Sequence, residues 1–184
     1  MAPPDNRLDT ARIPLTGRDV VVGFGANLGD RAATLARALS AFAPVARVSL
    51  VSSLYETAPV GPVDQPSFRN GAALVRTEAT PLLLLRHLLA IELELGRVRD
   101  QRWGPRIVDL DLLWIDGVVV HATNLTVPHP ELPRRAFALA PLVEVAPEAR
   151  DPRTGERLAD VLTRTGMEGV TRTARRLGDP GDGR

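Results

Sequence analysis

The chain is predicted to have an α+β fold with a ferredoxin-like βαββαβ core, an antiparallel sheet with helices packed on it, and extra short helices near the C-terminus. Two observations support this prediction. Short β-branched or alternating apolar runs are separated by two segments whose apolar residues recur at helical spacing. The chain has 184 residues, of which 44% are hydrophobic, and this is enough to bury one core of ordinary size.

The first half of the core is expected to consist of a strand, a helix and two further strands. The predicted elements are a strand at 19–24, a helix at 30–43, and strands at 45–57 and 68–79. In the helix, Leu35 and Phe42 share one face, and Asp30 stands where an N-cap residue is preferred. A loop rich in proline and glycine, at 58–67, separates the last two strands.

The second half begins with the clearest helix of the sequence. Thr80 is its expected cap, Pro81 takes the first helical position, and Gly96 ends it. The remaining predicted elements are a strand at 107–116, a paired segment GVVVH at 117–121 across an Asp-Gly turn, and short helices near 131–144 and 158–165. We expect one domain at 19–166 between flexible tails at 1–18 and 167–184.

Composition excludes several classes of protein. The chain has no cysteine, which rules out disulfides, thiolate zinc sites and a cysteine nucleophile. A net charge of +1 gives no general basic surface for nucleic acid or membrane, and no apolar run reaches the length of a membrane span. The first residues contain no apolar signal region. These features predict a cytoplasmic protein, and we expect a monomer.

One short stretch, RVRDQRWGPRIVDLDLLWID at 97–116, concentrates charge of both signs. In a strand, Asp109 and Asp111 would share one face, while the leucines that alternate with them face the core. Two neighbouring carboxylates repel unless a cation lies between them, and oxygen ligands favour Mg²⁺ or Mn²⁺ completed by substrate phosphates. With the preceding arginines, the pair predicts a magnesium–nucleotide triphosphate site. The alternative is a solvated strand face with surface arginines.

Two further motifs are weaker. The segment GFGANLGDR at 23–31 has glycine spacing that fits neither a dinucleotide fingerprint nor a P-loop, so a tight turn between strand and helix is the simpler interpretation. His129 lies between two prolines, close to Arg135 and Phe137, and is a candidate binding residue. His87 lies at the edge of a leucine-rich helical stripe and is interpreted as structural.

Five blocks occur in an order that resembles a known family. They are GANLGDR, SSLYETAPVG, DQPSFRNGA, IELELGRVRDQRWGPRIVDLDLL and LTVPHPELPRRAF. Together they closely resemble the 6-hydroxymethyl-7,8-dihydropterin pyrophosphokinases of folate biosynthesis, over about residues 20–165. The resemblance implies transfer of diphosphate from ATP to the pterin hydroxymethyl group, with AMP as the other product. It also implies two Mg²⁺ ions bound with ATP.

The resemblance assigns roles to particular residues. The implied catalytic residues are Arg97, Arg106, Asp109 and Asp111, of which the two aspartates would hold the metal ions. The implied pterin-binding residues are Thr57, Val60, Phe68, Asn70, Trp103 and Phe137. The implied nucleotide-binding residues are Glu92, Arg99, Arg106, Leu112, Thr126, His129 and Arg135. The sequence departs from some members at Leu89 and Pro130, where those members have glutamine and tyrosine.

Two other functions fit parts of the sequence. A metal-dependent hydrolase of nucleotides or phosphoesters could use the same aspartates with water as the nucleophile. A ferredoxin-like RNA-binding module could stack bases on strand aromatics, but aromatic residues make up only 4% of this chain and its charge is nearly balanced. The set Phe68, Asn70 and Phe137 favours a flat heterocyclic acceptor over the hydrolase, and the Asp109–Asp111 pair would repel RNA phosphates without a metal.

Overall fold

The computed structural model describes residues 9–58, 65–97 and 106–177. Their order of elements confirms the predicted βαββαβ core. The core elements are β1 (Val20–Ala26), α1 (Arg31–Ser40), β2 (Arg47–Val51), β3 (Ser53–Thr57), β4 (Phe68–Arg76), α2 (Pro81–Glu94) and β5 (Asp109–Ile115). They are followed by β6 (Val120–Ala122), β7 (Leu125–Val127), α3 (Ala136–Val145), α4 (Leu158–Thr165) and β8 (Val170–Arg176).

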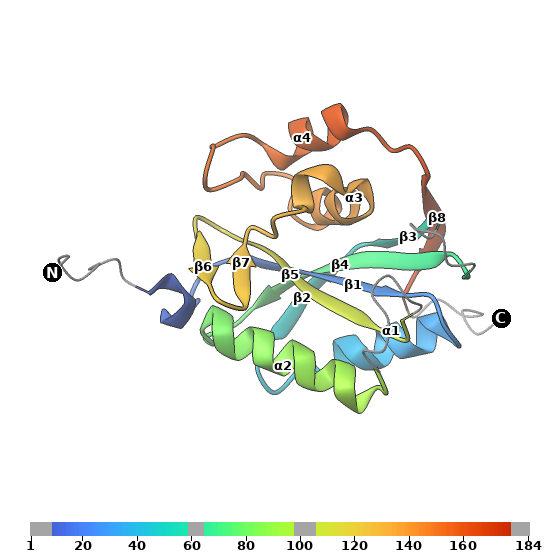
Figure 1. The fold of residues 1–184 in the computed structure, drawn as a ribbon, viewed down its shortest axis with the longest axis horizontal. Helices are drawn as coiled ribbons and strands as arrows, with labels where there is room; N and C mark the ends of the chain where they lie inside the picture. The colour runs from blue at the N-terminus through green and yellow to red at the C-terminus, as the bar shows by residue number, and fades with distance from the viewer. Residues whose placement is uncertain (1–8, 59–64, 98–105, 178–184) are drawn as a thin grey trace, which may run out of the picture.

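The main sheet is antiparallel, with strand order β5-β1-β4-β3-β8, and β2 pairs with β4 beside β3. Helices cover both of its faces (Figure 1): α1 and α2 lie on one face, and α3 and α4 on the other. Each face has its own buried apolar cluster. The first cluster includes Leu35 and Leu88, and the second includes Leu139 and Leu158. The sheet is therefore the middle layer of three.

The predicted helix signals are confirmed. The Asp30 carboxylate accepts a hydrogen bond from the Ala33 N–H at 3.0 Å, and the Thr80 hydroxyl accepts one from the Leu83 N–H at 3.2 Å. Gly96, just beyond α2, has a φ of 88°, in the left-handed region where glycine has no steric cost. His87 contacts the Ala41 carbonyl oxygen at 2.9 Å, in agreement with its structural interpretation.

Two strand predictions were wrong in detail. The run at 45–57 forms two strands that are separated at Ser52. There the Ala72 N–H donates to the Ser52 hydroxyl oxygen at 2.9 Å, and not to a backbone carbonyl as in a regular strand pair. The segment at 117–121 does not pair with the strand at 107–116. Its end belongs to β6, which forms a separate two-stranded sheet with β7.

The two predicted tails were also wrong for their described parts. Ala11 and Leu15 are buried in the core, and the Leu15 N–H donates to the Ala79 carbonyl oxygen at 3.1 Å. At the other end, Val170–Arg176 forms β8, which pairs with β3 at the sheet edge. Apolar side chains and strand pairing therefore tie both segments to the domain. Residues 1–8 and 178–184 lie outside the described part.

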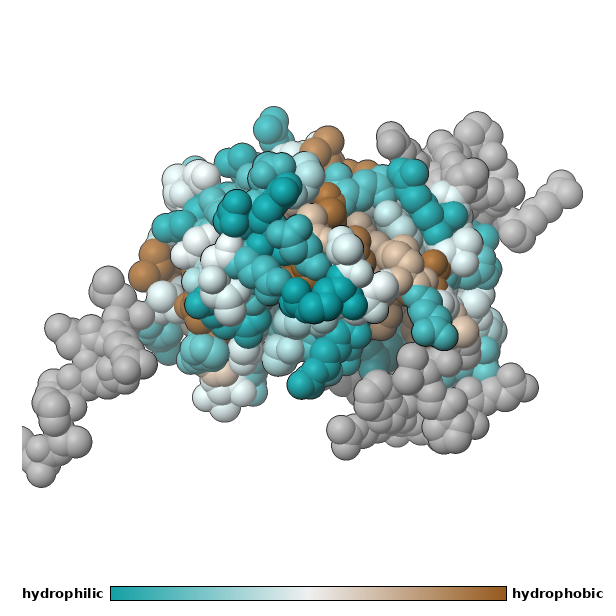
Figure 2. Space-filling model, turned by 90° about the horizontal axis from the view of Figure 1, so that it is seen from above, coloured by the Kyte–Doolittle hydropathy of each residue, from teal (hydrophilic) through white to brown (hydrophobic). Residues whose placement is uncertain are grey.

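No helix within the described ranges is long and apolar enough to cross a membrane. The face that carries α3 and α4 is mostly hydrophilic, with small hydrophobic areas among the polar residues (Figure 2). The mixed surface agrees with the nearly balanced charge of the chain.

Candidate active site

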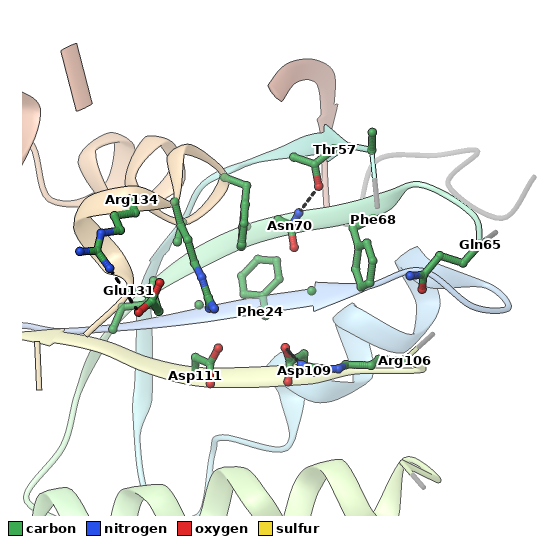
Figure 3. A pocket seen from close by; sticks show the side chains of 18 residues that line it. Phe24, Thr57, Gln65, Phe68, Asn70, Arg106, Asp109, Asp111, Glu131 and Arg134 are labelled. Carbon is green, nitrogen blue, oxygen red and sulfur yellow. Dashed lines mark hydrogen bonds and ion pairs between the residues drawn. The ribbon is translucent and has the colours of Figure 1, made fainter. Parts of the chain in front are cut away.

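A cavity of about 370 Å³ lies between the sheet and the start of α3. This volume is within the usual range for small-molecule sites. Side chains from β1, β3, β4, β5 and α3 line it, together with Arg106 just before β5 (Figure 3). Most of the predicted site residues that the structure describes meet here. They are Thr57, Phe68, Asn70, Arg106, Asp109, Asp111, Arg135 and Phe137.

Strand register brings the carboxylates and the asparagine to the same face. Gly25 of β1 pairs with Asp109 of β5 on one side and with Asn70 of β4 on the other. A Cβ atom at Gly25 would lie only 2.5 Å from the Asn70 Oδ1 atom. The glycine therefore lets the Asn70 amide lean across β1, toward the strand that carries the aspartates. This close approach is the structural reason for a glycine at this point of the GFGAN motif.

The heterocycle side of the cavity is formed around Asn70. Its Nδ2 donates to the Thr57 Oγ1 at 2.8 Å, which orients the amide and leaves its oxygen directed into the cavity (Figure 3). Phe68 lies at the start of β4, and Phe137 lies at the start of α3. The Arg135 guanidinium is 5.9 Å from the centre of the Phe137 ring. Two aromatic rings and a fixed amide can hold a flat, polar heterocycle.

The phosphate side contains a chain of ion pairs. Arg97 contacts the Glu92 carboxylate and is 2.7 Å from the Asp109 Oδ1, while Arg106 contacts the Asp109 Oδ2. Glu92 is 1% exposed and accepts the Leu110 N–H at 2.7 Å. Burial raises the pKa of Glu92, and its contacts with Leu110 and Arg97 oppose that shift. Both predicted catalytic arginines therefore converge on one carboxylate of β5.

Asp111 lies deeper along β5 and faces the same cavity. Burial raises its pKa, and the nearby Asp109 carboxylate raises it further. His129 is close by, where burial lowers its pKa and Asp111 opposes that shift. The His129 N–H donates to the Leu113 carbonyl oxygen at 2.8 Å, which fixes this loop against β5.

The donor set fits a hard divalent cation. Asp109 and Asp111 supply only carboxylate oxygens, and they share a polar cavity with arginines that can contact phosphates. No group of three or more acidic or histidine residues that could hold a metal occurs in the described part of the chain. Mg²⁺ commonly uses one or two carboxylates and completes its shell with water and substrate phosphates. The residues present therefore suit magnesium that arrives with a nucleotide.

Other predicted residues lie away from the cavity lining or outside the described ranges. The Leu112 side chain is buried in the opposite core, so only its backbone could contact a ligand. Thr126 is half-buried on β7, and Glu92 is linked to the site through Arg97 and the Leu110 N–H. Val60, Arg99 and Trp103 lie outside the described residues.

Sequence reasoning missed several residues that line the cavity. Gln65, Glu131 and Arg134 are the polar ones, and Phe24 lies on β1 beneath them (Figure 3). Arg134 and Glu131 belong to the segment that includes His129, so their neighbourhood was the available signal. Gln65 had a similar signal, because it stands in the DQPSFRNGA block three residues before Phe68.

Comparison with known proteins identifies the family. Residues 21–147 match the family model described as 7,8-dihydro-6-hydroxymethylpterin-pyrophosphokinase (HPPK). The chain belongs to this family. A curated HPPK-family relative from Pseudomonas aeruginosa, 2-amino-4-hydroxy-6-hydroxymethyldihydropteridine pyrophosphokinase, is 45% identical over 155 residues, which cover 83% of this chain and 95% of the relative. The relative of the same name from Methylorubrum extorquens is 42% identical over 153 residues, or 82% of this chain and 96% of the relative.

Solved structures show the same fold. A Plasmodium falciparum HPPK-DHPS structure with pteroate matches with a TM-score of 0.67 at 14% identity. The match covers 84% of this chain and 47% of that chain, so this chain corresponds to less than half of the larger protein. The HPPK resemblance read from the five sequence blocks and the predicted α+β fold are therefore both confirmed.

Proposed function

We propose that this chain transfers the diphosphate of ATP to the hydroxymethyl group of 6-hydroxymethyl-7,8-dihydropterin, giving AMP and the pterin diphosphate for folate biosynthesis. One observation supports this most directly. The Asp109–Asp111 pair with Arg106, and the Phe68–Asn70–Phe137 set, line the same cavity. The residues suited to phosphate and the residues suited to a heterocycle share one cavity, so ligands bound by the two sets could react with each other.

The protein residues act mainly by positioning and charge neutralisation, as in other phosphoryl transfers. Asn70 and the two phenylalanines hold the pterin so that its hydroxymethyl group faces β5. Arg97 and Arg106 are placed to exchange their contacts with Asp109 for contacts with phosphate oxygens. Magnesium held by Asp109 and Asp111 would neutralise phosphate charge and lower the pKa of the attacking hydroxyl.

The finer features of this function belong to the same proposal. Asp109 and Asp111, whose carboxylates both face the cavity, would hold two Mg²⁺ ions that enter with ATP and neutralise the charge of its phosphates. Thr57, Val60 and Trp103 complete the pterin site, and Glu92, Arg99, Leu112, Thr126, His129 and Arg135 complete the nucleotide side. The enzyme acts as a monomer in the cytoplasm.

The test is the dependence of AMP formation on the pterin. Purified protein is incubated with Mg²⁺ and ATP, with and without 6-hydroxymethyl-7,8-dihydropterin, and nucleotides are separated by chromatography. AMP and pterin diphosphate should form in equal amounts, and only when both substrates are present. Release of ADP or AMP at the same rate without pterin would instead identify a nucleotide hydrolase.

A further inference from the structure

Asn27, the first residue after β1, is buried and tied to two separate segments of the chain. It is 2% exposed. Its backbone N–H donates to the Arg106 carbonyl oxygen at 3.1 Å, and its Oδ1 accepts the Arg106 backbone N–H at 2.7 Å. Its Nδ2 donates to the Gln65 Oε1 at 2.9 Å and to the Pro66 carbonyl oxygen at 3.2 Å. One side chain therefore uses its acceptor on one segment and its donor on the other.

The two segments form adjoining walls at one end of the cavity (Figure 3). Arg106 lines it and contacts the Asp109 carboxylate, so this wall belongs to the phosphate side. Gln65 also lines it and precedes Phe68, so this wall belongs to the heterocycle side (Figure 3). Asn27 is itself not among the lining residues. Any effect on the reaction must therefore pass through the residues that it holds.

We propose that Asn27 is a positioning residue that sets the two walls of the active site relative to each other. This rests on the proposed function, since the walls are assigned by the substrates they hold. A primary amide offers a donor and an acceptor on one rigid, uncharged group, and no other side chain of similar size offers both in this geometry. The asparagine of the GFGAN motif thus has a role beyond a tight turn.

Removing this amide should displace residues in both walls. Asn27→Ala leaves the Arg106 N–H and the Gln65–Pro66 acceptors without their buried partner, and the walls can then shift apart. Misplacement of reacting groups by about 1 Å can cost roughly 100-fold in rate. We expect kcat to fall by about that factor and KM to rise for both substrates.

Asn27→Asp tests the contacts with the two segments separately. The aspartate keeps an acceptor for the Arg106 N–H but loses the donor to Gln65 and Pro66. Its KM for the pterin should rise at least about tenfold, while its KM for ATP should change by less than about threefold. An increase confined to the KM for ATP would contradict the assignment of the Gln65 segment to the heterocycle side and of Arg106 to the phosphate side.

A control must lose a similar buried link far from the cavity. Thr77 is buried, its hydroxyl donates to the Val45 carbonyl oxygen and accepts the Ala79 N–H at 3.0 Å, and it joins two segments at the other end of β4. Thr77→Ala should lower the melting temperature but keep kcat within about threefold. If Asn27→Ala lost no more kcat than Thr77→Ala at a similar loss of melting temperature, Asn27 would be merely structural and the proposal wrong.

A second measurement needs no substrate and so stands apart from the proposed function. The Arg106 amide should exchange its hydrogen slowly in the natural protein, because Asn27 accepts its hydrogen bond. Amide exchange at Arg106 should speed up in Asn27→Ala, stay slow in Asn27→Asp, and be unchanged in Thr77→Ala. Equal exchange in the natural protein and Asn27→Ala would overturn the proposal even if all four proteins transferred diphosphate.

Discussion

Two carboxylate clusters on the same face of the sheet differ in how well they are satisfied. Glu144 of α3 accepts hydrogen bonds from the Ser53 N–H at 3.0 Å, the Ser53 hydroxyl at 2.9 Å, the Tyr55 hydroxyl at 2.8 Å and the Arg172 guanidinium at 3.0 Å. Although burial opposes it, these donors lower the pKa of Glu144 to about 2. Burial, and then the neighbouring Asp109 carboxylate, instead raise the pKa of Asp111.

The difference separates stability from function. The Glu144 cluster joins α3, β3 and β8, so its ionised form stabilises the fold. Asp109 is paired with Arg97 and Arg106, but Asp111 lies buried beside it, and this burial and the neighbouring charge make its ionised form unfavourable. One carboxylate therefore ties α3 to β3 and β8, while the other two are those to which the proposed function assigns the metal ions.

Removing either aspartate should have the largest effect on turnover. Asp109→Asn or Asp111→Asn should lose at least about 10²-fold in kcat, because a displaced Mg²⁺ removes several kcal/mol of transition-state stabilisation. Turnover at saturating Mg²⁺ is the measurement, and circular dichroism checks that each variant is folded. Near-natural turnover in both variants would show that these aspartates do not hold the metal.

The arginines should contribute next. Arg97→Ala and Arg106→Ala should lower the rate of single turnovers by about 10- to 100-fold, with a smaller loss of ATP affinity, if their phosphate contacts strengthen in the transition state. Calorimetric titration with an ATP analogue and rapid-quench kinetics on the same variants compare the two quantities. Equal losses in affinity and rate would mean that the arginines act only in ground-state binding.

The heterocycle side should show a smaller and more selective effect. Asn70→Ala leaves polar groups of the pterin unpaired, and Phe137→Ala removes one wall, each at about 1–3 kcal/mol. Pterin affinity should fall by about 5- to 150-fold, while affinity for the ATP analogue alone stays within about threefold. Equilibrium titrations with each ligand make the test. If the variants lost nucleotide binding and kept pterin binding, the assignment of the pterin and nucleotide sides of the cavity would be reversed.

The Glu144 cluster should affect acid stability and leave pterin affinity unchanged. A carboxyl whose pKa is lowered on folding stabilises the protein above its unfolded value, near 4.5, and this contribution disappears as the pH falls toward 2. At about 1.4 kcal/mol per pKa unit, the contribution is at most about 3.5 kcal/mol. The Tyr55 hydroxyl, whose pKa burial raises to about 12, shares one of these hydrogen bonds, so the two shifts do not add.

Urea unfolding of Glu144→Gln across pH 2–7 checks this prediction. The variant should be less stable than the natural protein at pH 7, and the difference should shrink at low pH. Glu168→Gln changes the same charge at an exposed position and is the matched control. A difference that stayed constant with pH would show that packing, and not the ionised carboxylate, stabilises this cluster.

Local signals in the sequence were enough to predict the core. The helix at 80–96 has both caps, and the alternation around Asp109 and Asp111 places the carboxylates on one strand face. The order of the two terminal segments could not be predicted from local pattern. Ala11 and Leu15 stand among polar residues, and their burial depends on the rest of the fold. Local pattern therefore predicts elements well and the limits of a domain poorly.

The site divides in the same way. The aspartates, the arginines and Asn70 belong to motifs that can be read in the chain. The links made by Asn27 and Glu144 join positions 28 to 91 residues apart, and only tertiary structure brings their partners together. Gly25 is an intermediate case. Its motif can be read in the sequence, but the contact that requires a glycine there, with the Asn70 amide, is seen only in the structure.

The most direct test of the comparison is the free energy of unfolding of Asp111→Asn and Glu144→Gln, measured side by side in urea at pH 7 without metal. A carboxyl whose pKa is raised on folding contributes fully below its unfolded value and loses that contribution as the pH rises through its folded value, so ionising Asp111 costs stability in the folded state. We predict that Asp111→Asn is as stable as the natural protein or more so, while Glu144→Gln is less stable. Equal destabilisation of both variants would contradict the account.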